Sequence, residues 1–134
     1  MRAIGVHIDT RTVLVAGLII LAFGVVANLA FEVADNAADF GDDSNWPFAF
    51  YAVFLVGLVL GGRAAGRARP EAPLAHGALA ALAGLSVIAI ISVLIAVGFG
   101  NGIVDNLVKL LAQIPALVAV AALTAYLVAR RAHR

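Results

Sequence analysis

The chain has 134 residues, of which 63% are hydrophobic and 13% are charged, and its mean hydropathy is +1.05. Soluble domains are about 45–50% apolar and about 25% charged, and a domain this small has too little interior to hide so much apolar surface. The lack of cysteine excludes disulfides, thiolate metal sites and cysteine nucleophiles, and a net charge of +1 does not indicate a nucleic-acid partner.

Four apolar segments reach the roughly 20 residues that a membrane-crossing helix needs. The first covers residues 12–31, which is longer than the apolar region of a secretory signal, so we expect a retained span. The second covers residues 47–65, with Pro47 suited to the first turn of a helix. The third covers residues 74–99 and the fourth residues 103–129. The sequence therefore predicts an all-α fold, a single membrane domain built as a four-helix bundle.

The fourth segment contains a proline and begins with an amphipathic stretch over residues 103–114. Pro115 removes a backbone hydrogen bond and crowds the preceding turn, so we expect one long helix that is kinked near this residue. The alternative is a separate interfacial helix over residues 103–114, which would leave a short crossing segment behind it.

The charges divide between the two sides of this arrangement. The side with both termini and the loop 66–73 carries all eight arginines and two carboxylates, whereas the side with the loop 32–46 carries one lysine and six carboxylates. Positive residues near span ends stay in the cytoplasm. We therefore predict a multi-pass protein of the cell membrane with both termini cytoplasmic.

The acidic loop 32–46 offers candidate metal ligands. Glu32, Asp35 and Asp39 would share one face if the first helix continued beyond the membrane, and carboxylate oxygens attract calcium or magnesium. The loop lacks the ligand spacing of a calcium-binding hand. We favour a solvated acidic loop, with no bound metal or cofactor.

Small residues are concentrated around the basic loop. Glycines at four-residue spacing let helices approach closely in lipid, so we expect tight packing of the second and third spans through Gly57, Gly61, Gly62, Gly66, Gly77 and Gly84. The arginines Arg63 and Arg67 lie four residues apart, and with His76 they could form a site for a lipid headgroup or a small anion. We favour structural packing, with the two arginines anchored at lipid phosphates, and for His76 a hydrogen bond to a neighbouring loop carbonyl instead of a metal.

Apart from His76, close to the inner interface, the polar residues inside the predicted spans include no group that ionises near neutral pH. Ion-coupled transporters and proton relays usually need such a group at membrane depth. We instead expect hydrogen bonds between helices from four side chains, namely Asn28, Ser86, Ser92 and Thr124.

The stretch GGRAAGR, followed after a short turn by HGALAALAGL, resembles a family of small uncharacterised bacterial membrane proteins with four predicted spans, the YrzE-like group. The matching residues are Gly61, Gly62, Ala65, Gly66, Arg67, His76 and Gly77. The resemblance implies a four-span fold but no known activity. The turn of residues 69–73 departs from the shorter, lysine-rich connection of that group.

Three functions remain open at this stage. A non-catalytic accessory, assembly or self-associating bundle fits the small-residue faces, with the lipid bilayer and another membrane protein or itself as partners. A small oligomeric channel or transporter for a substrate that is not ion-coupled is the alternative. An enzyme is not expected, because no nucleophile–base pair, metal set or phosphate loop can be assembled.

Overall fold

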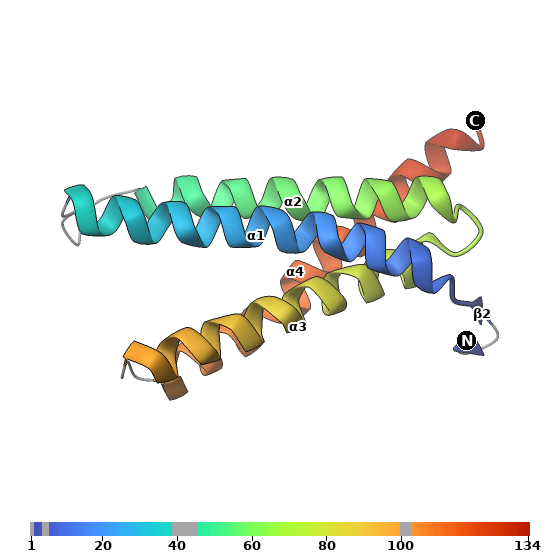
Figure 1. The fold of residues 1–134 in the computed structure, drawn as a ribbon. Coiled ribbons are helices and arrows are strands. Elements are labelled where there is room, and N and C mark those ends of the chain that lie inside the picture. The colour runs from blue at the N-terminus through green and yellow to red at the C-terminus, as the bar shows by residue number, and fades with distance from the viewer. Residues whose placement is uncertain (1, 4–5, 39–45, 100–102) are drawn as a thin grey trace.

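The computed structural model describes residues 2–3, 6–38, 46–99 and 103–134 (Figure 1). Within these residues the elements are four long helices, α1 (Thr10–Ala38), α2 (Trp46–Ala68), α3 (Pro73–Phe99) and α4 (Ile103–Ala132), preceded by two short antiparallel strands, β1 (Arg2–Ala3) and β2 (Val6–His7). The predicted four-helix, all-α fold is confirmed. Each helix holds a segment long and apolar enough to cross a membrane, so the chain is a multi-pass membrane protein.

The candidate spans are shorter than the helices that contain them. They cover Thr10–Ala30, Tyr51–Ala68, Pro73–Leu94 and Leu111–Ala132. The first helix therefore continues past its span, which is the condition stated above for Glu32, Asp35 and Asp39 to share one face. α2 begins at Trp46, which puts Pro47 in the first turn, where its missing N–H is not needed.

The fourth helix is continuous. α4 runs from Ile103 to Ala132 through Pro115, so the described residues form no separate interfacial helix before the proline. Proline cannot donate to the carbonyl four residues earlier, so the carbonyl of Leu111 lacks that helical partner. The side chain of Pro115 is exposed, which keeps its ring outside the packed interior.

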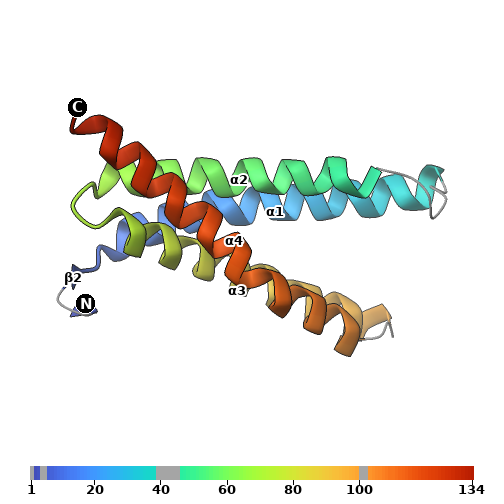
Figure 2. The ribbon, with the colours of Figure 1, turned by 180° about the vertical axis from the view of Figure 1, so that it is seen from behind.

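The helices form two antiparallel pairs that meet at one end (Figure 1). α1 and α4 each contact both α2 and α3, and α2 and α3 also contact each other, whereas α1 and α4 do not touch in the described part of the chain. Both termini and the connection from α2 to α3 lie at what we call the terminal end. Toward the opposite, far end, the α1–α2 pair and the α3–α4 pair diverge (Figure 2).

Buried side chains lie in the half of the bundle nearer the terminal end. Ile20, Leu58, Leu85 and Leu117 are the largest buried apolar ones, and they pack with small residues into one cluster. Among the described residues, none is buried after Ala27 in α1, before Gly57 in α2, after Ile88 in α3 or before Leu117 in α4. The packed core therefore ends near the middle of the helices.

A glycine marks the close approach in each of the four adjacent helix pairs. A Cβ added to Gly61 would lie 2.9 Å from the carbonyl oxygen of Ala16 in α1, and one added to Gly84 would lie 2.9 Å from the carbonyl oxygen of Gly17 in α1. Added Cβ atoms on Gly62, Gly66 and Gly77 would meet the α4 backbone around Ala121 and Ala125. Ordinary side chains at these positions would hold the helix backbones apart.

These partners differ from the predicted ones. We expected the glycines to bring α2 and α3 against each other, but the glycines of α2 and α3 approach α1 and α4. The reason is the order of the helices around the bundle, α1–α2–α4–α3. In this order α2 and α3 are diagonal neighbours, and each lies next to α1 and α4. Each of these two helices therefore uses its small residues toward two other neighbours.

The predicted hydrogen bonds between helices are also wrong for three of the four residues. Asn28 Nδ2 donates to the Gly24 carbonyl at 2.9 Å, and Ser86 Oγ donates to the Leu82 carbonyl at 2.6 Å. Thr124 Oγ1 donates to the carbonyl of Val120 at 2.7 Å. Each bond stays within one helix and spans four residues, because a short polar side chain reaches the carbonyl of its own preceding turn before it reaches another helix.

Candidate functional site

The most connected polar group among the described residues lies at the terminal end, where α1 begins. Asp9 directly precedes α1 and caps it, because its Oδ1 accepts from the Arg11 N–H at 3.2 Å and its Oδ2 from Thr12 Oγ1 at 2.7 Å. Its carbonyl accepts from the Val13 N–H, the first bond of the helix. A carboxylate here satisfies an unpaired helix N–H and lies at the positive end of the helix dipole.

Asp9 also joins the start of α1 to the connection between α2 and α3. Arg69 approaches Asp9 Oδ2 with two nitrogens, Nε and Nη2, each at 2.9 Å. A second carboxylate, Glu71, lies 3.4 Å from Arg69 Nη1. The hydrogen bond from Thr12, followed by that from Arg69, lowers the pKa of Asp9 to about 2, from 3.8. The Asp9 carboxylate in turn raises the pKa of Arg69.

His76, in the first turn of α3, also contacts Asp9 and so joins α3 to the start of α1. Its side chain is fully buried, its Nε2 accepts from the Asp9 N–H at 3.0 Å, and its Nδ1 lies 2.8 Å from the Ala72 carbonyl. A nitrogen that accepts from an amide carries no proton, so the proton is on Nδ1 and the imidazole is neutral. The expected bond from His76 to a neighbouring loop carbonyl is confirmed.

We call Asp9, Thr12, Arg69 and His76 the terminal cluster. The Thr12 hydroxyl donates to Asp9 and not to the His76 imidazole, so Thr12 and His76 do not form a nucleophile–base pair. Among the described side chains, every buried polar atom has a hydrogen-bond partner. The arrangement is that of a structural clamp, which ties the segment before α1 to the α2–α3 connection.

The anion site predicted from Arg63, Arg67 and His76 is not assembled as one group. Arg63 and Arg67 are exposed on α2. His76 is buried, and both its ring nitrogens are engaged by Asp9 and Ala72, so it has no free donor for an anion. The two arginines remain able to reach lipid phosphates, because long cationic side chains near a span end extend to the interface.

The metal hypothesis falls mainly on parts of the chain that the structure does not describe. Glu32 and Asp35 lie on α1, but their side chains are outside the described set, and Asp39 lies outside the described residues altogether. Among the side chains that are described, no group of three or more His, Asp or Glu could hold a metal ion.

Sequence reasoning missed Asp9, Thr12 and Arg69 as members of one cluster. An aspartate immediately before an apolar run, with a threonine three residues later, is a helix-start pattern that could have identified the cap. The remaining partners are 60 and 67 residues away along the chain. No local pattern could have indicated those contacts.

Comparisons of the chain with protein-family models, with curated proteins and with solved structures found no match.

Proposed function

We propose that this chain is a non-catalytic protein of the cell membrane, with both termini in the cytoplasm, that serves as an accessory or assembly subunit or associates with itself. The orientation is supported by the arginines, all of which are on the side of the termini. Fusions to the C-terminus test it. A fluorescent protein that matures only in the cytoplasm should fluoresce after Arg134, and a phosphatase active only outside should stay inactive; the reverse pattern would contradict the orientation.

The proposed role in association depends on the divergence of the two helix pairs. Beyond the core, large apolar side chains such as Leu94 (67% exposed) and Leu111 (62% exposed) are mostly exposed in the described part of the chain. Exposure to lipid costs little, since lipid tails are as apolar as leucine. What favours a protein partner is the shape, because two diverging pairs can contact an added helix from two sides.

The glycines support the same division of roles. All six glycines named from the sequence are used for contacts inside the chain, and they hold the terminal half together. We also propose that the chain resembles the YrzE-like group in fold. Packing within the chain is a physical reason for the small residues of the shared motif. Association with a partner is therefore assigned to the far half and not to the glycine faces.

Cysteine cross-linking in native membranes tests this assignment, and the lack of native cysteine makes every introduced thiol unique. Leu94→Cys and Leu111→Cys probe the far half. Leu18→Cys and Leu123→Cys, at 61% and 56% exposure, are matched controls beside the core. We expect adducts from the first pair only, with mass spectrometry distinguishing a second copy from another protein.

Equal yields at all four positions, or no adduct from the far half, would contradict the proposal. A defined homo-oligomer that conducts solute after reconstitution into liposomes would favour the channel or transporter alternative.

A further inference from the structure

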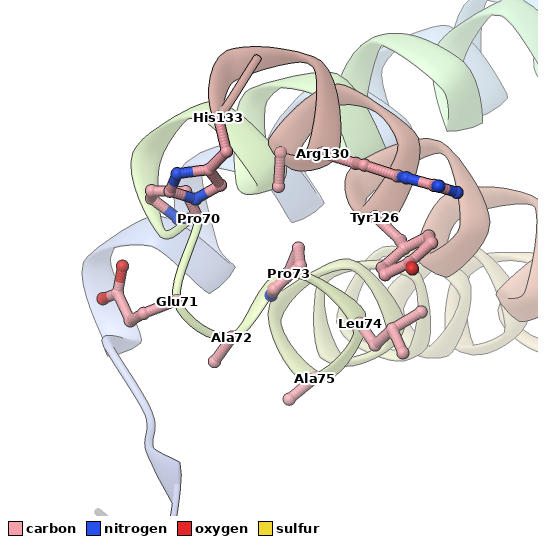
Figure 3. Close-up of a pocket in the computed structure, with 10 residues that line it drawn as sticks. Pro70, Glu71, Ala72, Pro73, Leu74, Ala75, Tyr126, Arg130 and His133 are labelled. Carbon is pink, nitrogen blue, oxygen red and sulfur yellow. The ribbon is translucent and has the colours of Figure 1, made fainter.

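A surface groove lies at the terminal end between the α2–α3 connection and the last turns of α4 (Figure 3). Its volume is about 540 Å³, within the roughly 300–1,000 Å³ of typical small-ligand sites. Its principal lining residues are Pro70, Pro73, Leu74, Tyr126, Arg130 and His133. None of these belongs to the terminal cluster or to the anion site predicted from the sequence.

The groove combines an apolar floor with a cationic rim. Leu74 and Tyr126 are 48% and 40% exposed, so they leave apolar surface open in the groove. Arg130 and Tyr126 lie on the same side of it, whereas Glu71 points away from them (Figure 3). The charge of Glu71 is also partly neutralised by Arg69, 3.4 Å away. The rim is therefore cationic on the side of Arg130 and Tyr126.

The groove is placed at the boundary between the apolar spans and water. The span in α3 starts at Pro73 and the span in α4 ends at Ala132, so both edges of the groove are span ends. Tyrosine is enriched at this depth because it has an apolar ring and a polar hydroxyl. A ligand here would have its apolar part toward the membrane and its polar part toward water.

We infer that this groove binds an anionic phospholipid, with its phosphate at Arg130 and an acyl chain along Leu74 and Tyr126, which lie on the same side of the groove (Figure 3). Arginine pairs with phosphate through several fixed N–H donors, so a single guanidinium can hold the headgroup. The apolar floor favours a lipid over a soluble phosphate compound, which would gain nothing from Leu74. The inference is independent of the partner proposed for the far half.

Native mass spectrometry of the detergent-purified full chain tests the inference, with phosphatidylglycerol and phosphatidylcholine as probes. We expect one phosphatidylglycerol to stay bound with clear preference over phosphatidylcholine. Arg130→Gln should weaken binding about fivefold, the effect of roughly one interfacial cation. Arg11→Gln, which removes another exposed arginine at the terminal end but outside the groove, is the matched control and should leave binding unchanged.

A second variant tests shape separately from charge. Ala75→Trp adds bulk to a lining residue without changing charge, and should reduce binding at least as much as Arg130→Gln. Unchanged thermal unfolding of both variants would show that they remain folded. Equal losses from Arg11→Gln and Arg130→Gln, equal binding of the two lipids, or displacement of the lipid by millimolar inorganic phosphate would each overturn the inference.

Discussion

Replacement of Gly66 by alanine tests the close packing of α2 on α4. The added Cβ would lie 2.8 Å from Ala125 Cα and 2.9 Å from Ala125 C, both backbone atoms of α4. Backbone cannot rotate away as a side chain can, so the two helices would have to separate by more than about 0.6 Å to reach the 3.4 Å of ordinary contact, since the Ala125 carbonyl oxygen is nearer still to the added Cβ. Overpacking of this kind costs about 1–3 kcal/mol.

Gly98→Ala is the matched control for this change. Gly98 lies in α3 with nothing within 4 Å of an added Cβ, so it gains the helix propensity of alanine, about 1 kcal/mol, without a clash. Gly66→Ala gains the same propensity, so the comparison of the two variants isolates the packing cost. At about 3–5 °C per kcal/mol for a chain of this size, Gly66→Ala should unfold roughly 3–15 °C below Gly98→Ala.

The measurement is thermal unfolding in mild detergent, followed by the loss of monodisperse protein in size-exclusion chromatography. Equal unfolding temperatures for the two variants would refute the reasoning, because α2 and α4 could not then be in backbone contact at Gly66. A lower temperature for Gly98→Ala would contradict it as well.

Three further predictions concern hydrogen bonds. His76→Leu should destabilise the fold by about 1–3 kcal/mol, because the Asp9 N–H would be buried without a partner; thermal unfolding and faster hydrogen exchange at that amide would detect it. The lowered pKa of Asp9 means that its stabilising effect is complete above about pH 4 and is lost as pH falls toward 2. Unfolding temperatures of the wild type and Asp9→Asn should therefore differ at pH 5 and converge near pH 2; a gap that persisted at pH 2 would disagree. Thr124→Val should change stability by less than about 0.5 kcal/mol, because the bond it removes lies within α4 and the shape of the side chain is kept; a larger loss in thermal unfolding would instead indicate a bond to another helix.

The charge and apolar patterns of this chain determined its fold class by themselves. Long apolar segments without charge are stable in lipid. Lipid offers no hydrogen-bond partner to the backbone, and a helix pairs its backbone groups within the segment, so four such segments imply four helices. For the same local reason Pro47 could be placed in the first turn of α2, and α4 could be expected to continue through Pro115.

The tertiary structure alone decided which helices the glycines serve and which polar groups meet. The spacing of Gly62 and Gly66 predicts a close approach but not its partner, because any neighbouring backbone would fit that face. The terminal cluster joins Asp9 to Arg69 and His76 over more than 60 residues, and the groove joins Leu74 to Arg130. Such contacts depend on the order in which the helices surround one another, and local sequence carries no record of that order.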